Sequence, residues 1–321
     1  MPEIWIPFGG VETLVTLQAE NLGSVESPDA ERISVDTERI SSKVKDAARL
    51  FICDSAPATF ELIKELLPTM QASNLKVFSA APRKVETAVT DLRGKVITLP
   101  PPVAGADSPG FIFAPDLKEP GGKVFVGTAH PDPLFGVVDS KVQACLNWVA
   151  GSRAVAAKER SGMEPSPFAK TEAYDSMESA AGEISEASFL SLLQRGGRLR
   201  TVMEDAPFDA LKNGFHEAPM SPSKGLIVGS GGAAYDDTFS SALRGIWGAL
   251  PAVRRSGSIL MVSECTEGLG SPALELLATG RLTGEGGKRR EKYVEGIEEV
   301  FYLSKLKDEY EVLLLSGLPE T

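Results

Sequence analysis

The sequence predicts an α/β protein built from two doubly wound α/β domains with a cleft between them. In both halves of the chain, short apolar runs typical of buried parallel strands alternate with helical patterns. The length of 321 residues is more than one hydrophobic core usually serves, and it suits two domains. A stretch rich in proline and glycine at residues 205–223 is the best candidate linker, so we place the domains at residues 1–206 and 207–321.

The N-terminal half begins with an extended pattern. Residues 4–6 and 11–17 predict two strands joined by a Pro-Phe-Gly-Gly turn, and the polar residues 21–39 predict a loop with a short helix. The apolar run at 50–53 predicts a buried strand, followed by a helix that ends near Pro68. Further expected elements are strands at 75–79, 123–127 and 202–203, loops at 96–110 and 129–135, a helix capped by Asp139 or Ser140, and an exposed stretch at 158–185.

The C-terminal half has the clearer α/β pattern. A strand at 225–229 leads into a glycine-rich turn at 230–234, and Asp236 or Asp237 can cap a helix whose buried face runs from Phe239 to Leu250. A strand at 258–262, a loop at 265–270 and a helix with Pro272 in its first turn follow. Two last strands are expected at 300–303 and 312–315.

Composition limits the classes of function. The chain has 42% hydrophobic and 24% charged residues, which is ordinary for a globular protein. Its net charge is −11 and its one cationic triplet, at 288–290, is typical of a solvated loop, so we expect no nucleic-acid partner. We expect no membrane span and no signal peptide, because no apolar run reaches the ~18 residues that a span needs. Three cysteines without Cys-x-x-Cys spacing predict a cytoplasmic protein and give no metal motif.

A glycine-rich turn at 229–233 lies between a predicted strand and a predicted helix, where backbone N–H groups can hold an anion. Its spacing is not Gly-x-Gly-x-x-Gly, and the two acids that follow oppose a phosphate, so a plain tight turn is the alternative. Arg244 comes about two helical turns later, near the face of those acids, and its alternative is an exposed arginine. We take Gly231, Gly232, Asp236 and Arg244 as candidates for binding a small carboxylate.

Acidic side chains follow several of the predicted strands. Asp54, Glu264 and Glu267 lie at strand ends, and open α/β sheets bind ligands at that edge. They are candidates for acid–base chemistry, and exposed loop acids are the alternative.

The loop before the helix at 140 carries a second group of candidates. His130 and Asp132 lie in this proline-punctuated loop, and Lys141 enters the helix that follows. His130 is equally compatible with a loop position and with a site. The chain contains only two histidines, His130 and His216, so a mechanism that needs three imidazoles is excluded.

Several stretches together resemble the nickel-dependent lactate racemase family of 2-hydroxy-acid racemases and epimerases. Residues 6–10 resemble its N-terminal β segment, residues 50–57 its strand with an Asp-His-Thr-Arg-Pro loop, and residues 129–151 its Pro-His-x-x-x-Gly…Gly-Gly-x-Lys segment. The strongest similarity covers residues 231–270, where Gly-Gly-Ala-Ala-Tyr-Asp-Asp and Glu-Cys-Thr-Glu-Gly-Leu-Gly match the family's Gly-Gly-Tyr-Pro-Leu-Asp-Gln and Cys-x-Asp-Gly-x-Gly. The family normally continues past position 321, so a C-terminal piece is expected to be absent here.

The resemblance implies a nickel pincer nucleotide bound covalently through a lysine, and two histidines that exchange the substrate's hydroxyl proton. The cofactor lysine corresponds to Lys141, and Asp54 is retained from the first loop. One catalytic histidine corresponds to Asp132, with His130 two residues away, and the other falls on a proline. The substrate lysine corresponds to Arg244. No histidine occurs from 142 to 215, where the nickel ligand is expected, so we assign no metal ligand.

The leading hypothesis is a lactate-racemase-like isomerase, a racemase or epimerase of 2-hydroxy acids, with degenerate catalytic histidines and altered or lost activity. Its catalytic candidates are His130, Asp132 and Lys141. The alternative is a non-catalytic protein that binds a small carboxylate or has a regulatory role on the same fold. A third hypothesis is an enzyme without the pincer that uses carboxylates and Lys141. The expected partner is a small hydroxy acid or carboxylate. The sequence leaves open whether the chain forms a homo-oligomer.

Overall fold

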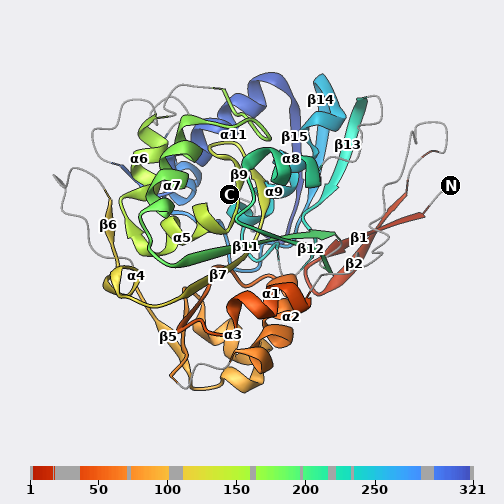
Figure 1. Cartoon of the computed structure of the whole chain (residues 1–321). Coiled ribbons are helices and arrows are strands. Elements are labelled where there is room, and N and C mark those ends of the chain that lie inside the picture. Colours follow the sequence, from red (N-terminus) through yellow and green to blue (C-terminus); the bar gives the residue numbers. More distant parts are fainter. Residues whose placement is uncertain are drawn as a thin grey trace.

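The structure is a computed structural model with a mixed α/β architecture (Figure 1). Its larger sheet has six strands and is mostly parallel, and a second sheet has three parallel strands. This confirms the predicted fold class. The described residues are 3–16, 18, 37–70, 74–100, 111–159, 164–195, 198–215, 222–232, 235–282 and 293–318.

The six-stranded sheet has the order β12-β11-β7-β3-β4-β5. All neighbours run parallel except β12, which pairs antiparallel with β11. Because its central strands are covered on both faces, they are almost continuously apolar, as the sequence predicts for 50–53 and 123–127. The strands are β3 (Arg49–Ile52), β4 (Lys76–Ser79), β5 (Val96–Thr98), β7 (Lys123–Thr128), β11 (Ala187–Arg195) and β12 (Arg198–Glu204).

Helices cover both faces of this sheet (Figure 1). One side carries α1 (Thr37–Val44), α2 (Pro57–Leu66) and α3 (Pro82–Ala88), and the other carries α5 (Ser140–Trp148), α6 (Ser152–Glu159) and α7 (Glu172–Gly182). Among the described residues, no helix is long and apolar enough to cross a membrane.

A row of stacked phenylalanines crosses four strands on the face toward α5. Phe51 is in register with Phe78 and Phe125, and its ring centroid lies 4.8 Å and 4.5 Å from theirs. Phe189 of β11 continues the row at 4.8 Å from Phe125. Trp148, the last residue of α5, meets Phe51 edge-on at 5.0 Å. These contacts fix the spacing between α5 and the strands, and therefore the position of the loops at the strand ends.

The second sheet has the order β13-β14-β15, with α9 and α11 packed against it. Its elements are β13 (Ser223–Gly229), α9 (Phe239–Ala249), β14 (Val253–Val262), α10 (Pro272–Ala278), α11 (Ile297–Glu309) and β15 (Glu311–Leu315). The remaining elements are the hairpins β1 (Glu3–Phe8)–β2 (Val11–Thr16) and β8 (His130–Asp132)–β9 (Gly136–Val138), the pair β6 (Ile112–Phe113)–β10 (Val149–Ala150), α4 (Pro115–Lys118), α8 (Phe208–Phe215), and three 3-10 turns at Leu67–Thr69, Thr90–Leu92 and Leu250–Ala252.

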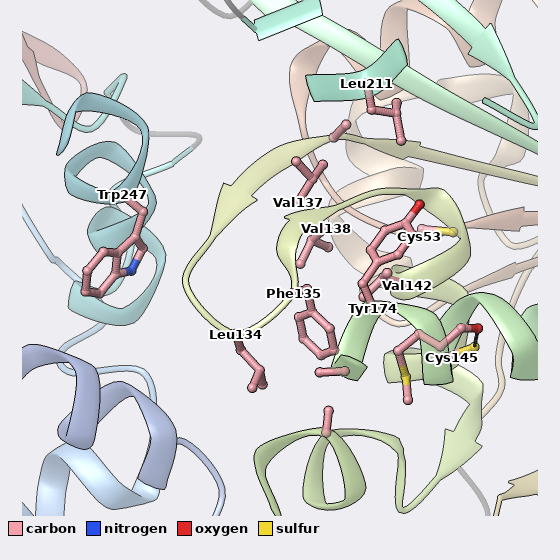
Figure 2. Close-up of a cluster of buried hydrophobic side chains, with 14 of the residues drawn as sticks. Cys53, Leu134, Phe135, Val137, Val138, Val142, Cys145, Tyr174, Leu211 and Trp247 are labelled. Atoms are coloured by element: carbon pink, nitrogen blue, oxygen red, sulfur yellow. Dashed lines mark hydrogen bonds between the residues drawn. The ribbon is translucent and has the colours of Figure 1, made fainter. Parts of the chain in front are cut away.

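The β8–β9 hairpin packs on α5 and α7 and also contacts α9 of the second sheet. Figure 2 shows its buried side chains Val137 and Val138 beside Val142 and Tyr174, with Trp247 of α9 in the same view. One buried cluster therefore includes residues from both sheets. The position of the domain boundary stays a prediction.

Several sequence-based assignments of structure are wrong. Residues 300–303 belong to α11, and the stretch 158–185 contains α7, which buries Tyr174 and Met177. The expected loop 129–135 contains β8, and the cap of α9 is Thr238, whose side chain accepts from the backbone N–H of Ser241. Burial against the rest of the fold decided α7 and α11, whose short-range patterns are weak. The expected linker contains α8, and its role as a linker stays a prediction. The Asp139 cap is confirmed. The strands β5 and β11 and helix α3 were not predicted, and residues 19–36 lie outside the described part.

Candidate functional site

The carboxyl ends of the strands in the two sheets face each other. Tyr235, after β13, donates a hydrogen bond to the side-chain oxygen of Gln194 in β11. Lys84 of α3 forms an ion pair with Asp237 and lies 4.0 Å from Glu267 of the loop after β14. Loops that follow strands therefore meet between the sheets, which is the edge where open α/β sheets bind ligands.

Arg244 extends from α9 toward this meeting point and remains exposed to solvent. Enough protein surrounds its guanidinium to lower its pKa, while the negative charges of Asp54 and Asp132 act in the opposite direction. No ion pair or hydrogen bond involves Arg244 within the part of the chain that the structure describes. A guanidinium stays charged at neutral pH, so Arg244 is an accessible cation beside two carboxylates that do not neutralise it by contact.

His130 lies within electrostatic reach of Arg244. Its Nδ1 is 3.3 Å from the carbonyl oxygen of Thr128. A carbonyl can only accept, so Nδ1 carries the hydrogen in this arrangement and Nε2 is a free acceptor. Burial lowers the pKa of His130 well below its usual value, and the positive charges of Arg244 and Arg153 lower it further. The imidazole is therefore neutral near pH 7 and can take a proton from a ligand.

Asp132 closes the β8–β9 turn. Its Oδ1 accepts from the backbone N–H groups of Leu134 at 2.7 Å and Phe135 at 2.9 Å. Burial raises the pKa of Asp132, and those two hydrogen bonds oppose the rise. His130 and Asp132 are two residues apart in one strand, so their side chains leave the same face of β8. Asp132 is close to the site, but one of its oxygens has a structural task.

Asp54 is occupied on both oxygens. Oδ1 accepts from the N–H of Ala56 at 3.0 Å and from the hydroxyl of Thr59 at 2.6 Å, and Oδ2 accepts from the N–H of Thr128 at 2.6 Å. These bonds join the start of α2 to the end of β7. Its charge reaches Arg244, so Asp54 contributes to the site through its field and by fixing Thr128.

Gly232 and Asp236 join the N-terminal hairpin to the second sheet, whereas a side chain at Gly231, which has φ +110°, would meet Tyr235. A side chain at Gly232, which has φ +83°, would meet Pro7 and the carbonyl of Gly9 at 3.2 and 3.3 Å. Asp236 is buried, and its Oδ2 accepts from the N–H of Gly9 at 2.9 Å and of Glu264 at 3.3 Å. Packing thus accounts for these residues, and their role in ligand binding stays a prediction.

We expect Asp236→Ala to lower the free energy of unfolding by about 2 kcal/mol, because two backbone N–H groups would lose a charged acceptor. Urea denaturation measures the change. Asp209→Ala, at an exposed position in the first turn of α8, is the matched control and should change stability by less than about 0.5 kcal/mol. Equal stability of the two variants would contradict the structural assignment of Asp236.

The contacts of Lys141 are with α7 and with the segment before α8. Its Nζ is 3.4 Å from Glu178 Oε1 of α7 and 3.2 Å from the carbonyl oxygen of Ala206, so the amine is already paired. The sequence offers no histidine between residues 142 and 215, and no group of three His, Cys, Asp or Glu side chains in the described residues could hold a metal ion. These residues do not fit the lysine-linked nickel pincer nucleotide that the resemblance implies.

Sequence reasoning missed three contributors to the site. Arg153 of α6 pairs with Glu298 and Glu299 at the start of α11, and its charge reaches His130. Gln143 donates to the carbonyl oxygen of Thr128, and Tyr235 feels the charges of Asp54 and Arg244. None of them belongs to a spacing motif. Only Tyr235, inside the strongest stretch of resemblance, carried a sequence signal.

The arrangement of the two sheets defines an α/β protein with the fold of lactate racemase. The structure is similar to that of the lactate racemase apoprotein from Thermoanaerobacterium thermosaccharolyticum, with a TM-score of 0.71 and 13% identity. The similarity covers 98% of this chain and 88% of that chain. No protein-family model and no curated protein sequence matches the chain. At this identity the likeness shows the fold.

Proposed function

We propose that the protein is a lactate-racemase-like isomerase that binds a small 2-hydroxy acid, with Arg244 holding the carboxylate and His130 exchanging the hydroxyl proton. One observation carries the proposal: the guanidinium of Arg244 is accessible, has no ion-pair partner in the described residues, and lies close enough to His130 for its charge to lower the pKa of that imidazole. The shared fold supports the class of reaction. No step is assigned to a lysine-linked cofactor, because Lys141 is paired elsewhere.

The chemistry of the two side chains suits this ligand class. A guanidinium can give two parallel hydrogen bonds to a carboxylate, which fixes the orientation of the acid as well as its position. The α-hydroxyl of a bound hydroxy acid can then donate to Nε2 of His130. Because the lowered pKa keeps this imidazole neutral near pH 7, its Nε2 can accept the hydrogen bond of the hydroxyl, although the same shift makes the ring a weaker base.

A second candidate is a binding or regulatory protein without turnover. Racemisation needs proton acceptors on both faces of the reacting carbon. His130 and Asp132 leave the same face of β8, and Oδ1 of Asp132 is held by two backbone N–H groups. This geometry supports proton exchange on one side of the ligand only. A protein that binds hydroxy acids without converting them would have the same geometry.

The proposal is tested by titrating the protein with D-lactate, L-lactate and acetate, followed by calorimetry or NMR shifts. We expect Arg244→Gln to weaken lactate binding about 30-fold, as for the loss of a charged hydrogen-bonded contact. Acetate lacks the hydroxyl, so it should bind more weakly than lactate to the unchanged protein. In His130→Gln, acetate and lactate should bind with equal affinity.

The matched control is Arg254→Gln, which removes an exposed guanidinium that donates to the carbonyl of Pro222. Its lactate affinity should equal that of the unchanged protein. Unaltered binding in Arg244→Gln would overturn the assignment of the site. Conversion of L-lactate to D-lactate, measured by chiral chromatography, separates the isomerase from the binding protein.

A further inference from the structure

Thr128, the last residue of β7, is held from two sides. Its N–H donates to Asp54 at 2.6 Å, and its hydroxyl lies 3.0 Å from that of Thr59. Its carbonyl oxygen accepts from Nε2 of Gln143 at 2.7 Å and is 3.3 Å from Nδ1 of His130. The carbonyl that faces the imidazole is therefore fixed by residues from α5 and from the loop after β3.

Among the described residues, the side chain of Gln143 makes one hydrogen bond, the one to the Thr128 carbonyl. The side chain is buried, and its Oε1 has no hydrogen-bond partner among the described residues. Rotating the amide would set its oxygen against the Thr128 carbonyl, so the amine must face that carbonyl. An amide with an unpaired oxygen is costly inside a protein, and its retention here suggests a task for the N–H group.

We propose that Gln143 is a positioning residue for His130, because it holds the Thr128 carbonyl where that oxygen selects the Nδ1-protonated tautomer. Nε2 is then left without a hydrogen and can accept one from a ligand. The inference rests on the proposed function in giving His130 a role, but the tautomer itself requires no ligand.

The same helix provides a matched control. Asn147 lies one turn after Gln143 in α5, and its Nδ2 donates to the carbonyl oxygen of Cys53 at 2.7 Å. The bond has the same type and length and also joins α5 to the end of a strand. Among the described residues, no histidine forms a hydrogen bond with the Cys53 carbonyl, so Asn147→Leu disturbs the packing of α5 without changing the acceptor of His130.

The experiment is an NMR measurement of the ring nitrogens of His130 in the full chain. The chain has only two histidines, so His216→Gln assigns the signals. At a pH where the ring is neutral, we expect the unchanged protein to have hydrogen on Nδ1. Gln143→Leu should raise the ratio of the Nε2-protonated to the Nδ1-protonated form about fivefold, as for the weakening of one hydrogen bond. Asn147→Leu should leave this ratio unchanged.

Three results would overturn the inference. An Nε2-protonated ring in the unchanged protein would do so without any variant, even if Gln143→Leu did not fold. A folded Gln143→Leu with the original ratio would reduce Gln143 to a packing residue. An equal change in Asn147→Leu would show a general effect of α5. Because all spectra are recorded without ligand, these outcomes are separate from loss of lactate binding, which tests the proposed function.

Discussion

Replacing Arg153 with methionine is expected to lower the free energy of unfolding by about 3 kcal/mol at pH 7, since it leaves two acids inside the protein without their cation. Arg153 Nε donates to Glu298, and its Nη2 donates to Glu299 at 3.0 Å. The side chains of Glu298 and Glu299 are only 7% and 15% exposed. Methionine retains the apolar stem and removes the charge.

The surrounding bonds prevent these carboxylates from turning into water. Glu299 also accepts from the hydroxyls of Ser240 at 2.7 Å and Ser271 at 2.9 Å, which belong to α9 and to the cap of α10. Glu298 accepts from the hydroxyl of Tyr293 at 3.3 Å. Arg153, on α6, thus joins the helices of the large sheet to three segments of the second sheet, and its loss affects the contact between them.

The deficit should depend on pH with a defined sign. Burial raises the pKa of Glu299 above its usual value, and Arg153 opposes this rise. Without Arg153, the pKa of Glu299 in the folded state moves further up. An acid with a raised folded pKa binds more protons when folded, so stability falls as pH rises from the unfolded pKa through the folded pKa. The variant should therefore lose more stability at pH 7 than at pH 4.

Urea denaturation at the two pH values measures this difference. Lys305→Met is the control on α11, because Lys305 pairs with Glu164 at 2.7 Å and that carboxylate is 62% exposed. An exposed pair contributes less than about 1 kcal/mol, so the control should stay near the unchanged protein. If Arg153→Met and Lys305→Met lost the same stability, the Arg153 contact would be no stronger than a surface ion pair.

Local patterns were sufficient for much of the fold. The apolar runs at 50–53 and 123–127 form the buried strands that the pattern predicts, and Asp139, one of the two expected caps, begins the helix that follows. They failed for residues 300–303, where a four-residue apolar run suits a strand as well as a helix. The length of the element decides such cases. Helix α11 extends over 13 residues, but charged residues interrupt its apolar positions, so the sequence does not show that length clearly.

Sequence reasoning named the charged candidates, and their role in a site stays a prediction. Asp54 and His130 follow strands, whose ends meet at one edge of an α/β sheet as the alternation of elements implies. Arg244 lies in α9, and its charge reaches both of them in the structure. The pairing of Lys141 with α7 could not be predicted, because α7 itself was read as an exposed stretch. The Arg153–Glu298 contact joins residues 145 positions apart, and no sequence spacing encodes it.

Replacing Gly127 with alanine should lower the free energy of unfolding by about 3 kcal/mol through overpacking. A Cβ at this position in β7 would overlap Oε1 of Gln143 and lie 2.9 Å from Cβ of Cys53. Neither neighbour can move freely: Gln143 is tied to the Thr128 carbonyl, and Cys53 is buried at the end of β3. Thermal or urea denaturation gives the loss. Gly182→Ala, at the end of α7 with open space around its Cα, should keep or slightly raise stability.

The clash also predicts a coupling between two positions. Gln143→Ala alone removes a buried side chain and its hydrogen bond, so it should destabilise the protein by itself. In the double variant Gly127→Ala with Gln143→Ala, the new methyl group enters space that the amide has left. The combined loss should therefore be smaller than the sum of the single losses by about 2 kcal/mol. If the two losses were strictly additive, the methyl group at position 127 would be resisted by the strand and not by Gln143. The absence of a side chain at position 127 would then be unrelated to the contact through which Gln143 positions His130.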